Sequence, residues 1–283
     1  MEKLMRAVFA LSTCVSILCV VVICLFLFAN GIPTIAKIGV LDFLTGTEWD
    51  PRPNDPDNAT FGIAPMIVAS VYVTAGAILV GTPIGVLTAI FLAKFCPKRI
   101  HGFLEFIVTL LAGIPSVIYG FFGLIVIAPF ISETFDSSGK NILTASLLLG
   151  MMILPTIISV SEAALRAVPA SYYEGSLALG ATHERSVFFV ILPAAKSGVM
   201  ASIILGVGRA IGETMAVIMV AGNQAYMPES ILEGARTMTA NIVLEMGYAA
   251  ELHREALIAT GVVLFVFILI INLLFSLVKR KAF

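Results

Sequence analysis

The sequence predicts an all-α, polytopic membrane protein with six transmembrane helices. The chain of 283 residues is 59% hydrophobic and only 12% charged, and its mean hydropathy is +1.03. Soluble domains carry roughly 25% charged residues, so this composition favours a chain that lies in a lipid bilayer. The formal net charge of −1 offers no basic surface for nucleic acid, and we expect none to bind.

The transmembrane helices are predicted from stretches that reach the length of about 20 apolar residues needed to cross hydrocarbon. These stretches cover roughly 8–29, 64–92, 104–130, 142–165, 197–221 and 256–278. Several contain Gly and Pro, which membrane helices tolerate because neighbouring helices satisfy the freed backbone groups. We expect residues 1–63 to form an N-terminal transmembrane helix with an outer loop, and residues 64–283 to form a core with five transmembrane helices.

The first apolar stretch predicts a retained anchor and fixes the orientation. It follows Lys3 and Arg6 and carries no charge from Ala7 to Ala36, which is too long for a secretory signal, and no A-x-A cleavage site follows. With the N-terminus inside, inner segments hold eleven of the 17 Lys and Arg residues, outer segments hold five, and Arg209 lies within a span. Positive residues favour the cytoplasm, so both termini are predicted to be cytoplasmic.

The outer segments differ from the inner ones. The stretch "TGTEWDPRPNDPDNATFG" (45–62) is predicted to be a loop, because it lacks helical or strand periodicity. Within the outer stretch 222–255, "TMTANIVLEMG" (237–247) is apolar but too short to span. We expect a re-entrant or interfacial helix there, with a plain loop as the alternative.

Sites for enzymatic chemistry are not evident in the sequence. No segment between spans is large enough to form a catalytic domain, and no nucleotide-cradling G-x-x-x-x-G-K-[ST] motif occurs. The cysteines lack the spacing of a zinc site or a disulfide framework, and the histidines form no ligand set; these residues are Cys14, Cys19, Cys24, Cys96, His101, His183 and His253. Glu162 and Arg166 are expected to form an interfacial i,i+4 salt bridge.

The inner stretch between spans four and five is unusually long. It covers about 166–196, has a helical apolar pattern, and includes Pro169 at a suitable helix start and Gly180 at a suitable break between two short helices. On composition alone, an ordinary interfacial connector explains it equally well.

The residues of this stretch resemble the EAA loop of bacterial ABC-importer permeases. That family pattern is E-A-A, three residues, Gly, nine residues, then I-x-L-P. The matching positions here are Glu174, Gly175, Ser176, Gly180, Val190, Leu192 and Pro193, with Gly, Ser and Val as the only replacements. The resemblance implies that this loop docks into a cleft on an ATP-binding subunit, with Glu174 as a contact and Gly180 as a hinge.

Arg209 and Glu213 are charged residues within a predicted span. Arg209 follows Lys196 by 13 residues, or about 20 Å along a helix within a core about 30 Å thick. Placing each charge there costs on the order of 3 kcal/mol. A spacing of four puts both on one helical face, close enough to pair, and small residues flank them: Gly206, Gly208, Ala210, Gly212, Thr214 and Ala216.

Two interpretations of this pair are open. A buried ion pair that fixes helix packing is the structural one, but such pairs rarely add net stability over apolar residues. A pair that faces a substrate pathway is favoured, because arginine is always ionised and its fork suits phosphate and similar oxyanions. Glu213 is then expected to orient Arg209 and to compete with a bound anion, so that release stays fast.

Motifs around this pair resemble the phosphate-specific ABC permeases over essentially the whole chain. They are "GRAIGETMAV" (208–217), "GIPSVIYGFFGL" (113–124), "FGIAPMIVASVYVTAGAILVGTPIGVLTAIFLA" (61–93) and "TMTANIVLEMG" (237–247). These motifs resemble the PstC-type subunit of that importer more than its PstA-type partner. The resemblance implies the MetI-like permease fold, a translocation role for Arg209 and Glu213, and pathway positions for Pro115, Ser116 and Thr214.

The resemblance also implies the partners and the location. A sister PstA-type permease, two PstB-type ATP-binding subunits and a PstS-type extracytoplasmic phosphate-binding protein would work with this chain in the inner membrane of a bacterium or archaeon. ATP and Mg²⁺ would be bound by those partners, and this chain would carry no cofactor and no enzymatic activity. The alternatives are a permease for molybdate or sulfate, an ion-coupled secondary carrier acting alone, and an intramembrane enzyme, for which no nucleophile–base set is visible.

Overall fold

The computed structural model describes residues 2–52 and 58–281, and long helices dominate it. These are α1 (Glu2–Ile38), α3 (Ala64–Ile90), α7 (Ile142–Arg166), α11 (Lys196–Gly212) and α14 (Glu251–Lys281). Five helices of the described residues are long and apolar enough to cross a membrane, and the number rises to six when a bent pair counts as one span. The prediction of six transmembrane helices agrees with the second count.

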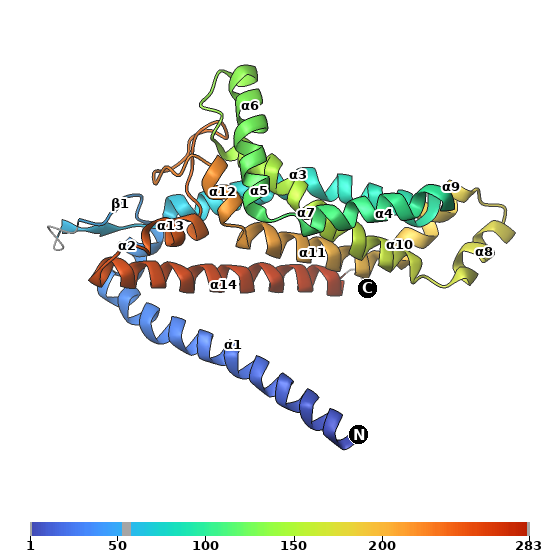
Figure 1. Ribbon diagram of the computed structural model, residues 1–283, viewed down its shortest axis with the longest axis horizontal. Coiled ribbons are helices and arrows are strands. Elements are labelled where there is room, and N and C mark those ends of the chain that lie inside the picture. Colours follow the sequence, from blue (N-terminus) through green and yellow to red (C-terminus); the bar gives the residue numbers. More distant parts are fainter. Residues whose placement is uncertain (1, 53–57, 282–283) are drawn as a thin grey trace.

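Shorter elements connect the long helices, and Figure 1 shows α2, β1 and α13 at one end of the molecule and α8 and α9 at the other. Before α7 they are α2 (Val40–Thr45), β1 (Trp49–Asp50), β2 (Thr60–Phe61), the π-helix η2 (Phe91–Phe95), α4 (Lys98–Gly113), α5 (Ser116–Phe122), the π-helix η3 (Gly123–Ile127) and α6 (Ala128–Phe135). After α7 they are α8 (Ala170–Ala178), α9 (His183–Ser186), the π-helix η4 (Val187–Ile191), α10 (Leu192–Ala194), α12 (Met215–Val220) and α13 (Met238–Glu245).

Helices α3 and α7 form the centre of the core. A Cβ atom at Gly81 of α3 would lie only 2.7 Å from the carbonyl oxygen of Gly150 in α7, so the two backbones approach closely there. Small residues permit this approach, and close van der Waals packing is what holds helices together in lipid. The main buried cluster includes Ala77, Met152 and Ile153 from these helices and extends to α12.

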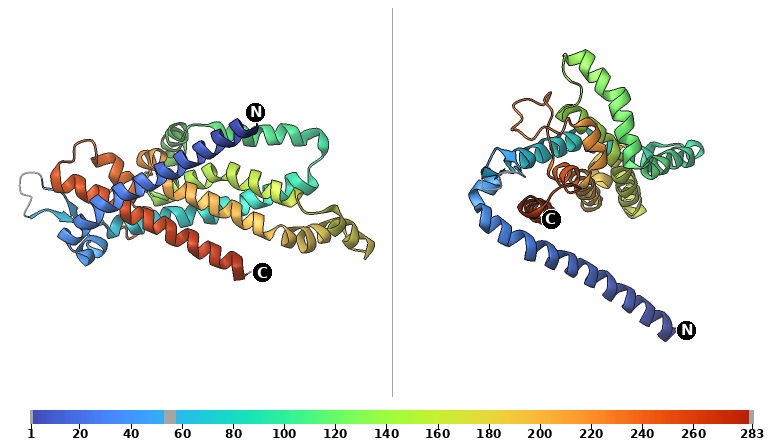
Figure 2. Two further views of the ribbon diagram at one scale, coloured as in Figure 1. Left: turned by 90° about the horizontal axis from the view of Figure 1, so that it is seen from below. Right: turned by 60° about the vertical axis from the view of Figure 1, so that its left-hand side comes forward.

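Helix α1 contacts α14 near its C-terminal end and leaves the rest of the body toward its N-terminus (Figures 1 and 2). The contact includes an edge-on pair of the Phe28 and Phe265 rings with centroids 5.7 Å apart. None of the most apolar window of α1 is buried within the chain. In a bilayer this surface is covered by lipid or by a neighbouring subunit, because lipid-exposed apolar side chains carry no desolvation cost.

Two spans are not the continuous helices that the sequence predicts. The stretch 104–130 is broken between α4 and α5 at Ile114 and Pro115, and the stretch 197–221 is broken between α11 and α12 at Glu213 and Thr214. Proline removes a backbone N–H and clashes with the preceding turn, which explains the first break. The bent pair that raises the count of candidate spans to six consists of His183–Ala194 and Lys196–Gly212, which meet at an angle of 69°.

The outer segments also refine the sequence predictions. The prediction of a plain loop for 45–62 is wrong in part, because Trp49 and Asp50 pair antiparallel with Phe61 and Thr60. Two paired residues are too few to produce a readable alternation of apolar and polar side chains. The helix expected within 237–247 is confirmed as α13, whose N-cap Thr237 accepts a hydrogen bond from the Ala240 N–H.

Candidate functional site

The break between α11 and α12 holds the two charges expected to face a pathway. Arg209 lies in the last turn of α11, and Glu213 follows the end of that helix with extended backbone (ψ 133°). The expected pairing of Arg209 with Glu213 on one helical face is therefore wrong. The Gly-rich stretch before the break is a poor helix former, and the Glu213 side chain finds another partner.

Glu213 and Thr214 stabilise the break itself. The Glu213 carboxylate Oε1 accepts a hydrogen bond from the Ala216 N–H at 3.2 Å, which satisfies one of the unpaired donors at the start of α12. The Thr214 hydroxyl donates to the Gly212 carbonyl oxygen at 3.3 Å. Non-helical backbone at membrane depth occurs where it is buried in protein or lines a cavity, and these two hydrogen bonds satisfy polar groups that the break would otherwise leave unpaired.

Arg209 has an open side. Among the described residues it makes no hydrogen bond and no ion pair, and its side chain is partly exposed. A Cβ atom added at Gly208 or Gly212 would meet no atom within 4 Å in the described part of the chain. An intramembrane charge is costly without a partner, and this cation has an uncovered face on the described part of the chain.

Pro115 and Ser116 lie at the other break, which is close to the first. Pro115 is exposed and precedes α5, and Ser116 is its first residue. The Tyr119 hydroxyl donates to the Leu111 carbonyl oxygen at 2.9 Å and bridges the two sides of the break. Gly120 of α5 contacts α12, where an added Cβ would lie 2.7 Å from Met219 Sδ. The fold therefore brings the two motifs together.

Thr239 connects the outer segment to the same region. Its hydroxyl donates to the Glu213 carbonyl oxygen at 3.1 Å, across the break between α11 and α12. The sequence analysis did not identify this residue. The only available signal was its position in the apolar stretch 237–247, which was too short to span.

Glu245, the last residue of α13, was also missed by the sequence analysis. It connects α13 to three other segments. It is 5% exposed and accepts hydrogen bonds from Trp49 Nε1 and His253 Nε2, each at 2.8 Å, and from the Arg236 guanidinium. These partners lie in β1, at the start of α14 and in the loop before α13. A carboxylate in an apolar segment was the signal, since such a group is rarely buried unless paired.

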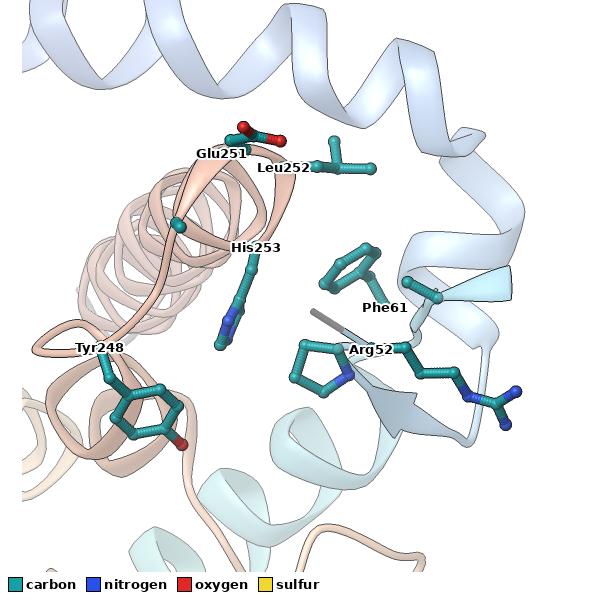
Figure 3. Close-up of a pocket in the computed structure, with 9 residues that line it drawn as sticks. Arg52, Phe61, Tyr248, Glu251, Leu252 and His253 are labelled. Carbon is teal, nitrogen blue, oxygen red and sulfur yellow. The ribbon is translucent and has the colours of Figure 1, made fainter. Parts of the chain in front are cut away.

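A pocket of about 250 Å³ opens beside this cluster at the outer end (Figure 3). Its wall includes Phe61 from the hairpin, and Tyr248, Leu252 and His253 from the turn into α14. Tyr248 is 70% exposed. Partial loss of solvent around its hydroxyl and the nearby Glu245 carboxylate raise the pKa of Tyr248 above its ordinary value.

The stretch 166–196, which we call the coupling loop after the family loop that it resembles, has the expected two-helix form. Helix α8 starts directly after Pro169, and Gly180 takes a left-handed conformation (φ +84°) before α9, so both expected boundaries are confirmed. Glu174, Gly175 and Gly180 are exposed, and Leu179 is 91% exposed. Tyr172 and Leu177 of α8 are exposed apolar side chains as well.

Ser176, Leu192 and Pro193 have supporting positions. The Ser176 hydroxyl donates to the Tyr173 carbonyl oxygen at 2.8 Å. Leu192 packs against the inner core cluster that contains Leu165 and Ile191. Pro193 lies in α10, which continues the helix from η4 without a break. These residues shape the loop, whereas Glu174 and Gly180 lie at its surface.

The Glu162–Arg166 pair is more than the simple salt bridge that its spacing predicts. Arg166 Nε donates to Glu162 Oε1 at 2.8 Å, and His101 Nε2 lies 2.7 Å from the same oxygen. Arg166 also donates to the Leu92 carbonyl oxygen at 3.2 Å. The cluster joins η2, α4 and α7 just before the coupling loop.

Comparison with known proteins places these features in a family. Residues 81–283 match the family described as binding-protein-dependent transport system inner membrane component. The chain is 40% identical over 271 residues to the probable ABC transporter permease protein YqgH of Bacillus subtilis, covering 92% of this chain and 86% of that protein. It is 34% identical over 261 residues to the phosphate transport system permease protein PstC of Mesorhizobium japonicum, covering 85% and 78%.

A solved structure has the same fold. An inward-facing structure of the MetNI methionine ABC transporter aligns with a TM-score of 0.63 and 20% identity, covering 78% of this chain and 96% of that chain. The predicted all-α, MetI-like permease fold is confirmed. Family match, relatives and fold agree that the chain belongs to the binding-protein-dependent transport system inner membrane component family of ABC transporter permeases.

Proposed function

We propose that this chain is a permease subunit of an ATP-driven importer for inorganic phosphate and forms half of its translocation pathway. The identity to a PstC permease over most of both chains supports phosphate as the substrate. The open face beside Arg209 supports a second permease subunit, because one chain leaves this side of the pathway uncovered. A sister PstA-type subunit would close it.

Arg209 is the proposed phosphate-binding residue of the pathway. Its guanidinium is ionised at any physiological pH and has no hydrogen-bonding or ion-pair partner among the described residues. A planar fork of donors matches the oxygens of phosphate. This single observation, a cation at a helix break with an unoccupied partner side, carries the proposal.

Glu213, Thr214, Pro115 and Ser116 complete this side of the pathway. Since the Glu213 carboxylate holds the start of α12, its proposed part is to shape the break and to repel phosphate from a site that would otherwise bind too tightly. Thr214 and Ser116 offer hydroxyl groups beside the two breaks, and Pro115 keeps α4 and α5 apart. A site with too deep an energy well cannot conduct.

The coupling loop is the proposed docking site for two PstB-type ATP-binding subunits. Glu174, Gly175 and Gly180 at its surface would make the contact, while Ser176, Leu192 and Pro193 hold its shape. ATP and Mg²⁺ would be bound by those partners, so this chain carries no cofactor and performs no chemistry itself. The loop then lies in the cytoplasm, together with both termini.

The outer end is the proposed meeting place with a PstS-type phosphate-binding protein. The family description, which names dependence on a binding protein, supports such a partner. The Figure 3 pocket and the exposed Tyr248 lie on that face. Import of phosphate then proceeds from the binding protein, past Arg209, to the cytoplasm of a bacterium or archaeon.

Substrate competition in vesicles that contain the whole complex tests this function. Unlabelled phosphate and arsenate are expected to compete with ATP-driven phosphate uptake, whereas sulfate and molybdate are not. Stronger competition by molybdate or sulfate would assign the permease to that oxyanion. Uptake that persists without ATP and stops when ion gradients are dissipated would assign it to the secondary carriers.

A further inference from the structure

We propose that His183 fastens the coupling loop to α3 and that this connection carries the movement of α8 into the membrane core. The proposal rests on the proposed function, because it assumes that α8 moves with an ATP-binding subunit. His183 and Tyr173 are positioning residues in this proposal, since neither lies at the substrate pathway. Tyr173 precedes the family motif pattern described above, and His183 occupies one of its unspecified positions.

The hydrogen bonds of His183 define the connection. Its Nε2 lies 3.1 Å from the carbonyl oxygen of Lys94, at the end of η2, and its Nδ1 lies 2.8 Å from the hydroxyl of Tyr173 in α8. A carbonyl oxygen can only accept, so Nε2 carries the proton and donates. With the proton on Nε2, Nδ1 can accept from the Tyr173 hydroxyl, and the imidazole links two elements that are far apart in sequence.

Aromatic packing holds the imidazole in this orientation. The Phe95 ring meets it edge-on with centroids 4.7 Å apart, and the Tyr173 ring meets it at 86° with centroids 5.7 Å apart. Tyr173 itself packs against the inner core cluster. A side chain whose ring is fixed on both sides transmits displacement better than one that is free to rotate.

Helix α3 reaches from this connection to the outer segment. At its inner end the chain continues as η2, whose Lys94 carbonyl accepts from His183. Near its outer end, buried Ser70 accepts a hydrogen bond from the Met238 N–H of α13 at 3.0 Å. Thr239, also in α13, donates to the Glu213 carbonyl oxygen at the break between α11 and α12.

The chain connects α8 to the core on both sides, from α7 before it and through α9 and η4 to α11 after it, and α8 also packs on η4. The bond through His183 adds a lateral connection to α3. This lateral connection leads along α3 to α13 and the break. Without it, we expect ATP-binding subunits to dock and hydrolyse ATP while less of that movement reaches the pathway.

The test measures phosphate uptake and ATP hydrolysis in the same vesicles, with the whole complex reconstituted. Tyr173→Phe and His183→Ala are expected to lower the phosphate transported per ATP by about two- to tenfold, which is the range of one net hydrogen bond. His183→Gln is expected to retain most of the ratio, because its amide both donates and accepts. Tyr172→Phe is the matched control: its neighbouring ring is exposed, and the structure describes no side-chain hydrogen bond for it.

An unchanged ratio in Tyr173→Phe and His183→Ala, with intact assembly, would overturn the proposal. Loss of the ATP-binding subunits from Tyr173→Phe would also overturn it, because Tyr173 would then belong to the docking surface. Failure of the proposed function has a different result: Glu174→Ala and Gly180→Ala would leave co-purification and transport unchanged, whatever the ratio in the His183 variants.

Discussion

Replacing Glu245 by alanine is expected to destabilise the outer segment strongly. The change removes the acceptor shared by Trp49, His253 and Arg236 and leaves the Arg236 cation, whose side chain is 17% exposed, without its carboxylate. Breaking a buried ion pair by removing one partner costs about 3–5 kcal/mol. At about 1.4 kcal/mol per factor of ten, the opening equilibrium of α13 then rises by about a hundredfold to a few thousandfold.

Hydrogen–deuterium exchange of the α13 amides in the purified complex measures this effect, because local opening sets the exchange of protected amides. Glu255→Ala is the matched control: its pair with Lys37 is exposed, with side chains 44% and 63% accessible, and such pairs contribute about 0–1 kcal/mol. Glu245→Gln should lie between the two, since it keeps an acceptor but loses the charge. Less than tenfold faster exchange in Glu245→Ala would refute the reasoning.

Three further substitutions test local packing and backbone geometry. Gly120→Ala should destabilise the purified complex by about 1–3 kcal/mol, because its Cβ would lie 2.7 Å from Met219 Sδ and 3.0 Å from Ala216 Cα. Gly113→Ala is the control, since its Cβ would meet no described atom within 4 Å. Equal melting temperatures of the two variants would contradict this prediction. Gly180→Ala, at φ +84°, should strain the coupling loop by about 1–2 kcal/mol and reduce co-purification of ATP-binding subunits, whereas Gly102→Ala, in α4 and with no described atom within 4 Å of its added Cβ, should not. Tyr119→Phe loses the bond to the Leu111 carbonyl and should lower stability by about 0.5–1.5 kcal/mol; an unchanged melting temperature would show that the bond does not hold the break.

The long helices were predictable because hydrocarbon thickness sets a length that apolar windows detect directly. Helices α3 and α7 begin and end within a few residues of the stretches 64–92 and 142–165. The coupling loop was predictable for a local reason as well, since Pro169 and Gly180 act on their own backbone. These features depend on residues close together in the sequence.

The two helix breaks were not predictable from hydropathy. A break of two residues, such as Glu213 and Thr214, leaves the average over a membrane-spanning window unchanged. The spacing of Arg209 and Glu213 suggested an intrahelical pair, but the Glu213 carboxylate instead accepts from the Ala216 N–H. A local backbone donor competed with the expected partner.

The polar clusters were beyond sequence reasoning because their members are far apart along the chain. Trp49 and Glu245 are 196 residues apart, and His101 and Glu162 are 61 apart. Only the packing of the hairpin on α13, and of α4 on α7, brings these groups together. The division of the chain at residue 63 and the pathway role of Arg209 stay predictions.

The most direct test of the central claim is the water accessibility of position 209 in the assembled complex. Cys14, Cys19, Cys24 and Cys96 are first replaced by serine or alanine, and Arg209→Cys is then introduced. If this side chain faces the phosphate pathway, a charged, water-soluble thiol reagent will modify it, and the rate will change when ATP cycling alternates access to the site. Modification only by a lipid-soluble reagent, or none in any nucleotide state, would contradict the account.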